Sequence, residues 1–272
     1  MPRMTSSALE EIIAVLGAPA AGNPSQYLFE RALEAAGLEW QVVTCDVEPG
    51  RIAEAVAGAA AMGFRGCLLA GPLRRAVLPL VASASPTAQF AGGAGLLERT
   101  EGGFIGHMTD GRGVVEALRA HLDPANRNLL VLGAGLTARA TALELALAGV
   151  ERIGIAGPDA DLASKLVADL ASVHAKPVEL VAWGHRLAVP ADVGIVVRAT
   201  DATLQLDGMR SDIVFADLDP EASAPAESLA AGCCFVDGLE IRAVQAAIDF
   251  HSLTGLGTDP DMLREVLDEF LS

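Results

Sequence analysis

The residues of this chain that suggest chemistry most directly are two glycines, Gly133 and Gly135, in the sequence VLGAGLTARA. The apolar run Leu129 to Leu132 before them predicts a strand that is buried on both faces of a parallel sheet. The Ala- and Leu-rich segment from Leu136 to Leu147 predicts a helix. Glycines at such a turn let a phosphate approach the backbone, and the helix N-terminus offers unpaired N–H groups and a partial positive charge. The pattern Gly133-x-Gly135-x-x-Ala138 therefore predicts a dinucleotide site, although a tight turn without a ligand has the same pattern.

Length and charge limit the classes of partner. A chain of 272 residues fits one large domain or two ordinary ones. A net charge of −16 argues against nucleic acid and anionic membranes, because both reward clustered Lys and Arg, whereas backbone N–H groups can still hold a free nucleotide. The chain has no apolar run of about 18 residues, and Met1 to Leu9 lacks a leader pattern, so a cytoplasmic protein is expected.

The cysteines and histidines do not indicate a metal site. The four cysteines have no metal-ligand spacing and are too few for a disulfide scaffold, so buried reduced thiols are expected. The five histidines do not cluster in the sequence, and no metal is predicted. The cysteines are Cys45, Cys67, Cys233 and Cys234, and the histidines are His107, His121, His174, His185 and His251.

Strand and helix patterns alternate along the chain, which predicts an α/β fold with parallel sheets. In the first half the patterns predict strands at 11–16, 40–45 and 66–69, helices at 26–36, 51–62 and 114–121, and a hairpin turn at 101–103. In the second half they predict five strands, at 129–132, 152–156, 178–181, 192–200 and 212–217, and helices at 136–147 and 162–173. Two further helices, at 239–250 and 260–271, could close back on the first half.

The order of these motifs resembles the shikimate dehydrogenase family. The resemblance rests on VLGAGLTARA at Val131 to Ala140, TDGRG at Thr109 to Gly113 and DGLEIRAVQAA at Asp237 to Ala247. It extends to Gly17-x-Pro19 and to the segment from Gly66 to Pro72. The resemblance implies a discontinuous α/β substrate-binding domain, residues 1–122 completed by 239–272, and a Rossmann NAD(P)-binding domain, residues 123–238. It also implies a substrate cleft between the two domains.

The resemblance assigns a catalytic pair, with one change. The family has a Lys two residues after the proline and an Asp in an Asn-Thr-Asp triplet. Asp110 matches the aspartate, while Arg74 falls on the lysine position and Met108 on the triplet's asparagine. A guanidinium with a pKa above about 12 does not exchange protons. We therefore expect Arg74 to orient a substrate oxygen or to pair with Asp110; the alternative is an arginine on the solvated surface.

The substrate contacts that the resemblance implies are partly lost. The family's two N-terminal serines fall on Asn23 and Ser25, and Gln245 matches a substrate contact unchanged. Other polar contacts are replaced by apolar side chains at Leu68, Ala70 and Leu96. A buried polar group of the substrate without a partner costs about 1–3 kcal/mol, so we expect a substrate that is less polar than shikimate.

The resemblance also places the cofactor. Members that use NADP have an Asn-Arg-Thr triplet where this chain has Gly157, Pro158 and Asp159, and a carboxylate there favours the ribose hydroxyl of NAD. A cap for the following helix is the alternative role of Asp159. Arg198 could instead hold a phosphate, which would point to NADP. The expected cofactor-binding residues are Gly133, Ala134, Gly135, Leu136, Thr137, Asp159, Arg198 and Gly238.

Two functions follow from these observations. The first is an NAD(P)-dependent dehydrogenase that moves a hydride between nicotinamide and an alcohol or ketone, with Asp110 as acid or base. The alternative is a catalytically impaired paralogue that acts as a dinucleotide-binding or regulatory protein. The expected partner is a small-molecule substrate, and neither nucleic acid nor membranes are expected. A homodimer is an open alternative.

Overall fold

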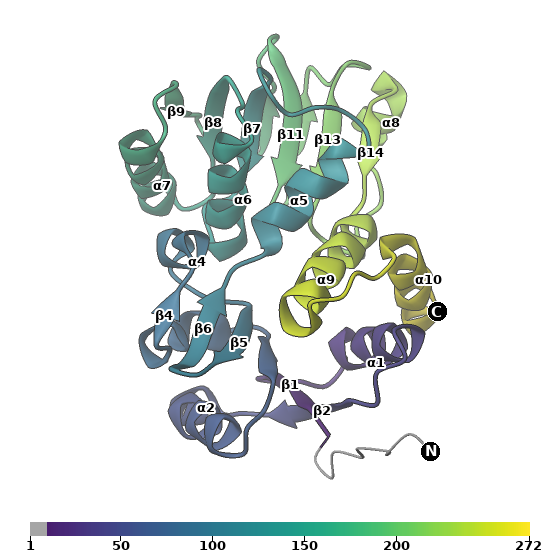
Figure 1. The fold of residues 1–272 in the computed structure, drawn as a ribbon. Coiled ribbons are helices and arrows are strands. Elements are labelled where there is room, and N and C mark those ends of the chain that lie inside the picture. Colours follow the sequence, from purple (N-terminus) through teal and green to yellow (C-terminus); the bar gives the residue numbers. More distant parts are fainter. Residues whose placement is uncertain (1–9) are drawn as a thin grey trace.

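A computed structural model describes residues 10–272, which form two α/β lobes with helices between them (Figure 1). The expected absence of a leader concerns Met1 to Leu9, which lie outside the described residues. Among residues 10–272, no helix combines the length and the apolar character that a membrane crossing needs.

The first lobe is built on a six-stranded sheet in the order β2-β1-β3-β5-β6-β4. The predicted parallel strands and hairpin are confirmed, because β1, β2 and β3 are parallel while β5 and β6 pair antiparallel. Its strands are β1 (Ile12–Gly17), β2 (Gln41–Asp46), β3 (Gly66–Leu69), β4 (Ser83–Ala84), β5 (Leu96–Thr100) and β6 (Gly103–His107). Its helices are α1 (Ser25–Ala35), α2 (Ile52–Ala61), α3 (Leu73–Ala76) and α4 (Pro86–Ala91), with 3₁₀ turns at Pro49–Arg51 and Leu78–Leu80.

The second lobe is built on a six-stranded parallel sheet in the order β14-β13-β11-β7-β8-β9. The prediction of five strands missed the sixth strand of this sheet, β14, whose three residues are too few to show a period. The strands are β7 (Asn128–Leu132), β8 (Arg152–Ala156), β9 (Val178–Leu180), β11 (Val193–Arg198), β13 (Val214–Asp217) and β14 (Cys234–Val236). The helices are α6 (Leu136–Leu147), α7 (Ala160–Val173) and α8 (Ala226–Ala231), and β10 (Arg186–Ala188) pairs with β12 (Gln205–Asp207) in a separate ribbon.

Helix α5 (Asp110–Arg119) connects the lobes and begins four residues before the predicted start at Val114. The two glycines that suggested a loop are needed for packing. A Cβ atom on Gly111 would overlap the backbone of Ala140 on α6, and one on Gly113 would lie 2.9 Å from Cβ of Gln245. Helix α5 can therefore approach both neighbouring helices closely.

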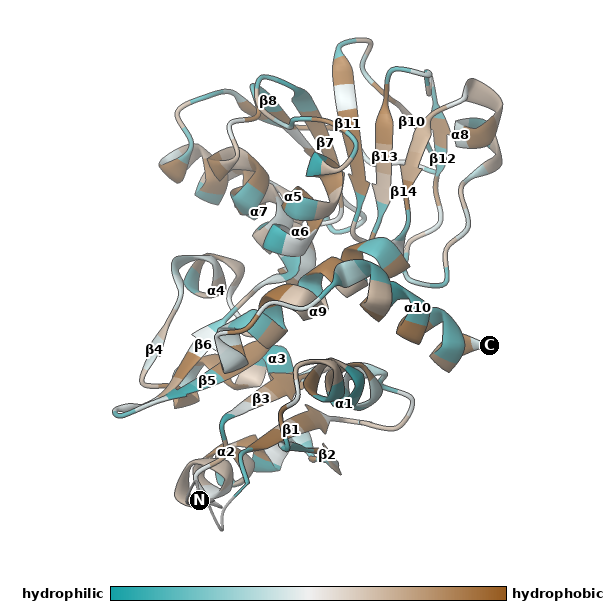
Figure 2. Ribbon diagram, turned by 45° about the vertical axis from the view of Figure 1, so that its right-hand side comes forward, coloured by the Kyte–Doolittle hydropathy of each residue, from teal (hydrophilic) through white to brown (hydrophobic). Residues whose placement is uncertain are grey.

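The last two helices, α9 (Gly238–Thr254) and α10 (Pro260–Leu271), return to the first lobe as expected. Helix α9 packs on α5, α1 and α10, and α10 packs on α1. Phe250, Leu253 and Leu263 join Ile13 and Leu28 in one buried cluster of the first lobe. In Figure 2 the strands of both sheets are mostly apolar, which is typical of sheets covered on both faces.

The expectation of buried thiols holds for one of the four cysteines. Cys67 is buried, and burial raises the pKa of its thiol to about 12. Cys45 is exposed, while Cys233 and Cys234 are partly exposed. All four are free thiols.

Candidate active site

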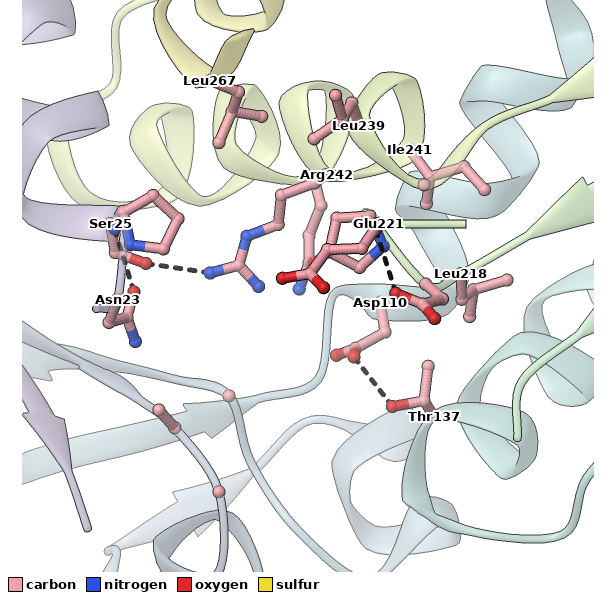
Figure 3. A pocket seen from close by; sticks show the side chains of 18 of the residues that line it. Asn23, Ser25, Asp110, Thr137, Leu218, Glu221, Leu239, Ile241, Arg242 and Leu267 are labelled. Atoms are coloured by element: carbon pink, nitrogen blue, oxygen red, sulfur yellow. Dashed lines mark hydrogen bonds between the residues drawn. The ribbon is translucent and has the colours of Figure 1, made fainter. Parts of the chain in front are cut away.

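A cavity of about 670 Å³ lies between the two lobes (Figure 3). Its walls come from the start of α1, the ends of β3, β11 and β13, the first turn of α5, and α9. Five of the residues singled out in the sequence as catalytic or substrate-binding line it: Asn23, Ser25, Arg74, Asp110 and Gln245. A crevice at the carboxyl ends of parallel strands is the usual ligand site of α/β folds.

Arg74 and Asp110 form an ion pair inside this cavity. Nη2 of Arg74 lies 2.5 Å from Oδ2 of Asp110, and the two side chains are 19% and 9% exposed. Nη2 of Arg74 also lies 3.1 Å from Sδ of Met108, and the hydroxyl of Thr137 donates to Oδ1 of Asp110 at 3.1 Å. The expected pairing is present, and the alternative of a solvated surface arginine is wrong. Nε of Arg74 is buried without a hydrogen-bond partner among the residues that the structure describes.

Ser25 is held from two sides at one end of the cavity. Its backbone N–H donates to Oδ1 of Asn23 at 2.9 Å, and its hydroxyl accepts a hydrogen bond from Nη2 of Arg242 at 2.9 Å (Figure 3). Burial lowers the pKa of Arg242, against the opposing charges of Asp249 and Asp110. A guanidinium and a hydroxyl at one end of a cavity suit a carboxylate or another oxygen-rich group.

Asp249 is another of the carboxyl groups that line the cavity. Its side chain is 7% exposed, and Oδ1 accepts a hydrogen bond from the hydroxyl of Thr109 at 2.6 Å. Gln245 in turn donates to the Thr109 hydroxyl at 3.3 Å. Burial raises the pKa of Asp249 to about 7, and the neighbouring Asp110 adds to the shift.

Arg242 and Asp249 are not among the residues predicted from the sequence. Both lie on α9 at helical spacing from Gln245, three residues before it and four after it, which places all three on one face of the helix. Charged side chains at this spacing usually mark a solvated face. The sequence did contain one signal for Arg242 and Asp249: Gln245, a predicted substrate contact, lies on the same face of the helix.

The positions of the three apolar replacements differ. Leu68 and Ala70 line the cavity, as expected for positions that contact a substrate. Leu96 is fully buried in the core of the first lobe and is not among the residues that line the cavity.

The glycine turn has the geometry that a pyrophosphate needs. Gly133 has a φ of +125°, and a Cβ there would lie 2.5 Å from the carbonyl oxygen of Ala199. Gly135 has a φ of −73° and no described atom within 4 Å of its Cβ position. No side chain from residues 10–272 caps the N-terminus of α6, so its first N–H groups stay available. Buried Ala134 lies beside Gly157.

Other residues that were predicted to bind the cofactor contact other parts of the protein. Leu136 packs toward Gly93 of the first lobe, and Thr137 donates to Asp110. Gly238 lies against the backbone of Asp219, where a Cβ would overlap it.

Arg198 lines the cavity and forms an ion pair with Asp217, which is fully buried. Burial raises the pKa of Asp217, and the guanidinium opposes this shift. The charge of Arg198 therefore already has a partner in the protein.

Asp159 caps α7. Its Oδ1 accepts hydrogen bonds from the backbone N–H groups of Asp161 and Leu162, at 3.1 and 3.0 Å. The capping role considered in the sequence is thus present, and within the described part of the chain Oδ2 has no hydrogen bond. Between residues 10 and 272, no three His, Cys, Asp or Glu side chains gather to hold a metal ion.

Comparison with known proteins adds several similarities. The sequence profile of the shikimate dehydrogenase substrate binding domain matches residues 15–96. The chain is 31% identical to the shikimate dehydrogenase (NADP(+)) of Citrifermentans bemidjiense, over 93% of this chain and 92% of that protein. It is 30% identical to the enzyme of the same name from Moorella thermoacetica, over 95% and 92% of the two chains.

Solved structures show the same fold. The ligand-free 5-ketofructose reductase of Gluconobacter sp. strain CHM43 matches with a TM-score of 0.91 and 29% identity, over 96% of this chain and 99% of that one. The shikimate 5-dehydrogenase of Listeria monocytogenes, solved with shikimate and NAD, matches with a TM-score of 0.87 and 24% identity, over 98% and 99% of the two chains.

Proposed function

Because the chain belongs to the shikimate dehydrogenase family, we propose that it is an NAD(P)-dependent oxidoreductase that moves a hydride between nicotinamide and an alcohol or ketone. The observation that carries this proposal is the Arg74–Asp110 pair in a cavity between an open glycine turn and the first lobe. When bound, the dinucleotide would supply or accept the hydride. Asp110 and Arg74 then belong to the reacting cluster, and Asn23, Ser25 and Gln245 bind the substrate.

The proposed division into domains follows the sheets. Residues 1–122 with 239–272 would form the substrate-binding domain, and residues 123–238 the Rossmann domain. The two six-stranded sheets and the packing of α9 and α10 on α1 support this division.

The proposed substrate is an acid with fewer hydroxyl groups than shikimate. Leu68 and Ala70 offer no hydrogen bonds where the family has polar contacts, so each hydroxyl there would lose a partner. The guanidinium of Arg242 beside Ser25 supports a carboxylate at that end. The similarity to a 5-ketofructose reductase favours the alternative, a neutral carbonyl substrate, because 5-ketofructose has no carboxylate.

The proposed cofactor is NAD, with NADP as the alternative. The segment from Gly157 to Ser164 contains no Lys or Arg that could hold a 2′-phosphate, and Arg198 is already paired with Asp217. A carboxylate at Asp159 favours the ribose hydroxyls of NAD. The relatives above carry NADP(+) in their names, which supports the alternative.

A thermal-shift titration with NAD and, separately, NADP tests the proposal. Saturation at about 100 times Kd adds about 2.7 kcal/mol to the free energy of unfolding, which raises the Tm by several degrees. We expect this rise with NAD. Asp159→Asn is the matched variant, because Asn caps a helix as well as Asp does, and it should bind NADP better relative to NAD.

The other outcomes of the titration contradict either the cofactor preference or the proposed function. A rise with NADP alone contradicts the preference for NAD, and a Tm that neither dinucleotide changes overturns the proposed function. Binding without hydride transfer to or from shikimate, quinate and 5-ketofructose, followed by the absorbance of the reduced nicotinamide, would support the catalytically impaired paralogue. The arginine in the lysine position is the observation that favours that alternative.

A further inference from the structure

Asp249 is a buried carboxyl group that faces the cavity and takes no part in an ion pair among residues 10–272. Its one described hydrogen bond comes from a neutral donor, the Thr109 hydroxyl, and engages Oδ1. A buried carboxylate without a cationic partner is costly, so burial favours the protonated form. Oδ2 is then the oxygen that can hold the proton.

The charged groups around Asp249 do not neutralise it. Arg74, from α3, is bonded to Asp110, and Arg242, from α9 itself, is bonded to Ser25. Both lower the pKa of Asp249, but burial and the negative charge of Asp110 on α5 outweigh them. Asp110 and Asp249, two of the carboxyl groups that line the cavity, thus have different environments.

Asp110 has the opposite environment. A guanidinium donates to one of its oxygens and the Thr137 hydroxyl to the other, which are the contacts of an ionised carboxylate. Two carboxyl groups can take different roles when their surroundings favour different protonation states. The protonated group donates a proton, and the ionised group stays charged.

We propose that Asp249 supplies the proton for carbonyl reduction, because the guanidinium of Arg74 cannot supply one. This inference rests on the proposed function. In the reduction, the carbonyl carbon would gain a C–H bond from the hydride that a bound dinucleotide supplies, and the π electrons of the carbonyl would move to its oxygen. The oxygen takes the proton from Asp249, which leaves an alcohol, the oxidised dinucleotide and the Asp249 carboxylate. In the oxidation the carboxylate accepts the alcohol proton, and exchange with water restores Asp249 between turnovers.

The protonation state of Asp249 is tested directly by ¹³C NMR of the Asp carboxyl carbons in the whole protein. Asp249→Asn assigns the signal by its loss, and Asp268→Asn, which removes an exposed carboxyl on α10, is the control. We expect the Asp249 signal to titrate near neutral pH. A midpoint near 4, the ordinary value for Asp, would overturn the proposal.

The proton transfer is tested by the pH dependence of turnover with 5-ketofructose in reduction and shikimate in oxidation. In Asp249→Asn we expect kcat to fall about 10²–10⁴-fold, with a smaller change in KM, and the inflection of the wild-type profile near pH 7 to disappear. Asp110→Asn should also be slow, but it should keep an inflection at a somewhat lower pH, because burial still raises the pKa of Asp249 while the smaller contribution of the Asp110 charge is gone.

Two results would count against the inference in different ways. An Asp249→Asn variant with the wild-type kcat and pH profile overturns the role of Asp249 and leaves the proposed function standing. A wild-type protein that binds the dinucleotide but transfers hydride neither with these two compounds nor with acids that have fewer hydroxyl groups than shikimate overturns the proposed function, and this role with it, whatever the NMR titration shows.

Discussion

Arg74 and Arg242 bring two guanidinium groups into one cavity of a protein whose net charge is −16. Asp110 balances one of them, while a protonated Asp249 balances neither. Arg242 therefore keeps a charge that neither of these two carboxyl groups balances, and this charge favours an anionic group of the substrate beside Ser25 in spite of the overall charge of the chain.

The buried Asp249 makes stability depend on pH. Its pKa is raised in the folded state to about 7, so between the unfolded value of about 4 and pH 7 the folded protein holds a proton that the unfolded chain has lost. The free energy of unfolding should therefore decrease as the pH rises through this window. Asp249→Asn removes the effect, and its stability relative to the wild type should increase by on the order of 3 kcal/mol between pH 4 and pH 8.

Urea unfolding of both proteins at several pH values measures this difference. Asp268→Asn is again the control and should follow the wild type at each pH. A constant difference between Asp249→Asn and the wild type over the whole range would show that the folded protein holds Asp249 ionised.

At the level of residues, the sequence identified the side chains that lie in motifs. Asp110, Ser25 and Gln245 line the cavity as expected, because short motifs fix their neighbours along the chain. Arg242 and Asp249 were missed, because only the three-dimensional position of α9 separates an inward charged face from a solvated one.

The turn between β7 and α6 contains two glycines with different tasks. Gly133→Ala places a Cβ against the carbonyl of Ala199 at a positive φ, so it should destabilise the protein by more than 1 kcal/mol. Gly135→Ala meets open space at an ordinary φ, so the protein should fold with nearly the wild-type Tm. Because that space is where the pyrophosphate would lie, Gly135→Ala should weaken dinucleotide binding at least tenfold.

The measurements are the Tm without ligand and calorimetric titration with NAD and NADP. The two variants are matched, since they add the same methyl group two residues apart. If Gly135→Ala binds both dinucleotides as tightly as the wild type, the turn does not contact the cofactor.

The sequence predicted helices and strands well where a regular apolar pattern covers the whole element and ends at a clear stop signal. The helices at 136–147 and 260–271 and the strands at 66–69 and 152–156 have the expected ends. Short elements such as β10, β12, β14 and α4 were not predicted, because three to six residues are too few to show a regular apolar pattern. The early start of α5 was not predicted, because glycine usually indicates a loop. Here Gly111 and Gly113 permit close helix packing instead.

At the scale of the whole molecule, the first lobe depends on helices that come from the other end of the chain. Leu263 of α10 is 1% exposed in the same cluster as Ile13 and Leu28. Leu263→Ala should therefore cost 2–5 kcal/mol and act on the first lobe. Hydrogen exchange should become faster in β1 and β2, while β7 and β11 should keep their protection.

Leu256→Ala is the control, because Leu256 lies between α9 and α10 and is 42% exposed. It should change neither lobe. Equal loss of protection in both sheets of Leu263→Ala would show that the two lobes unfold as one unit.

The dependence of β1, β2 and β3 on α9 and α10 also affects synthesis. Arg242 bonds to a serine 217 positions earlier, and Arg65 bonds to the carbonyl of Leu253, 188 positions later. On the ribosome the strands of the first lobe emerge long before these helices, whereas all strands of the second sheet precede α9. The nascent chain therefore completes the strands of the second sheet first, while the first sheet still lacks the cover of α9 and α10. During that interval the early strands are open to aggregation and are natural clients for chaperones.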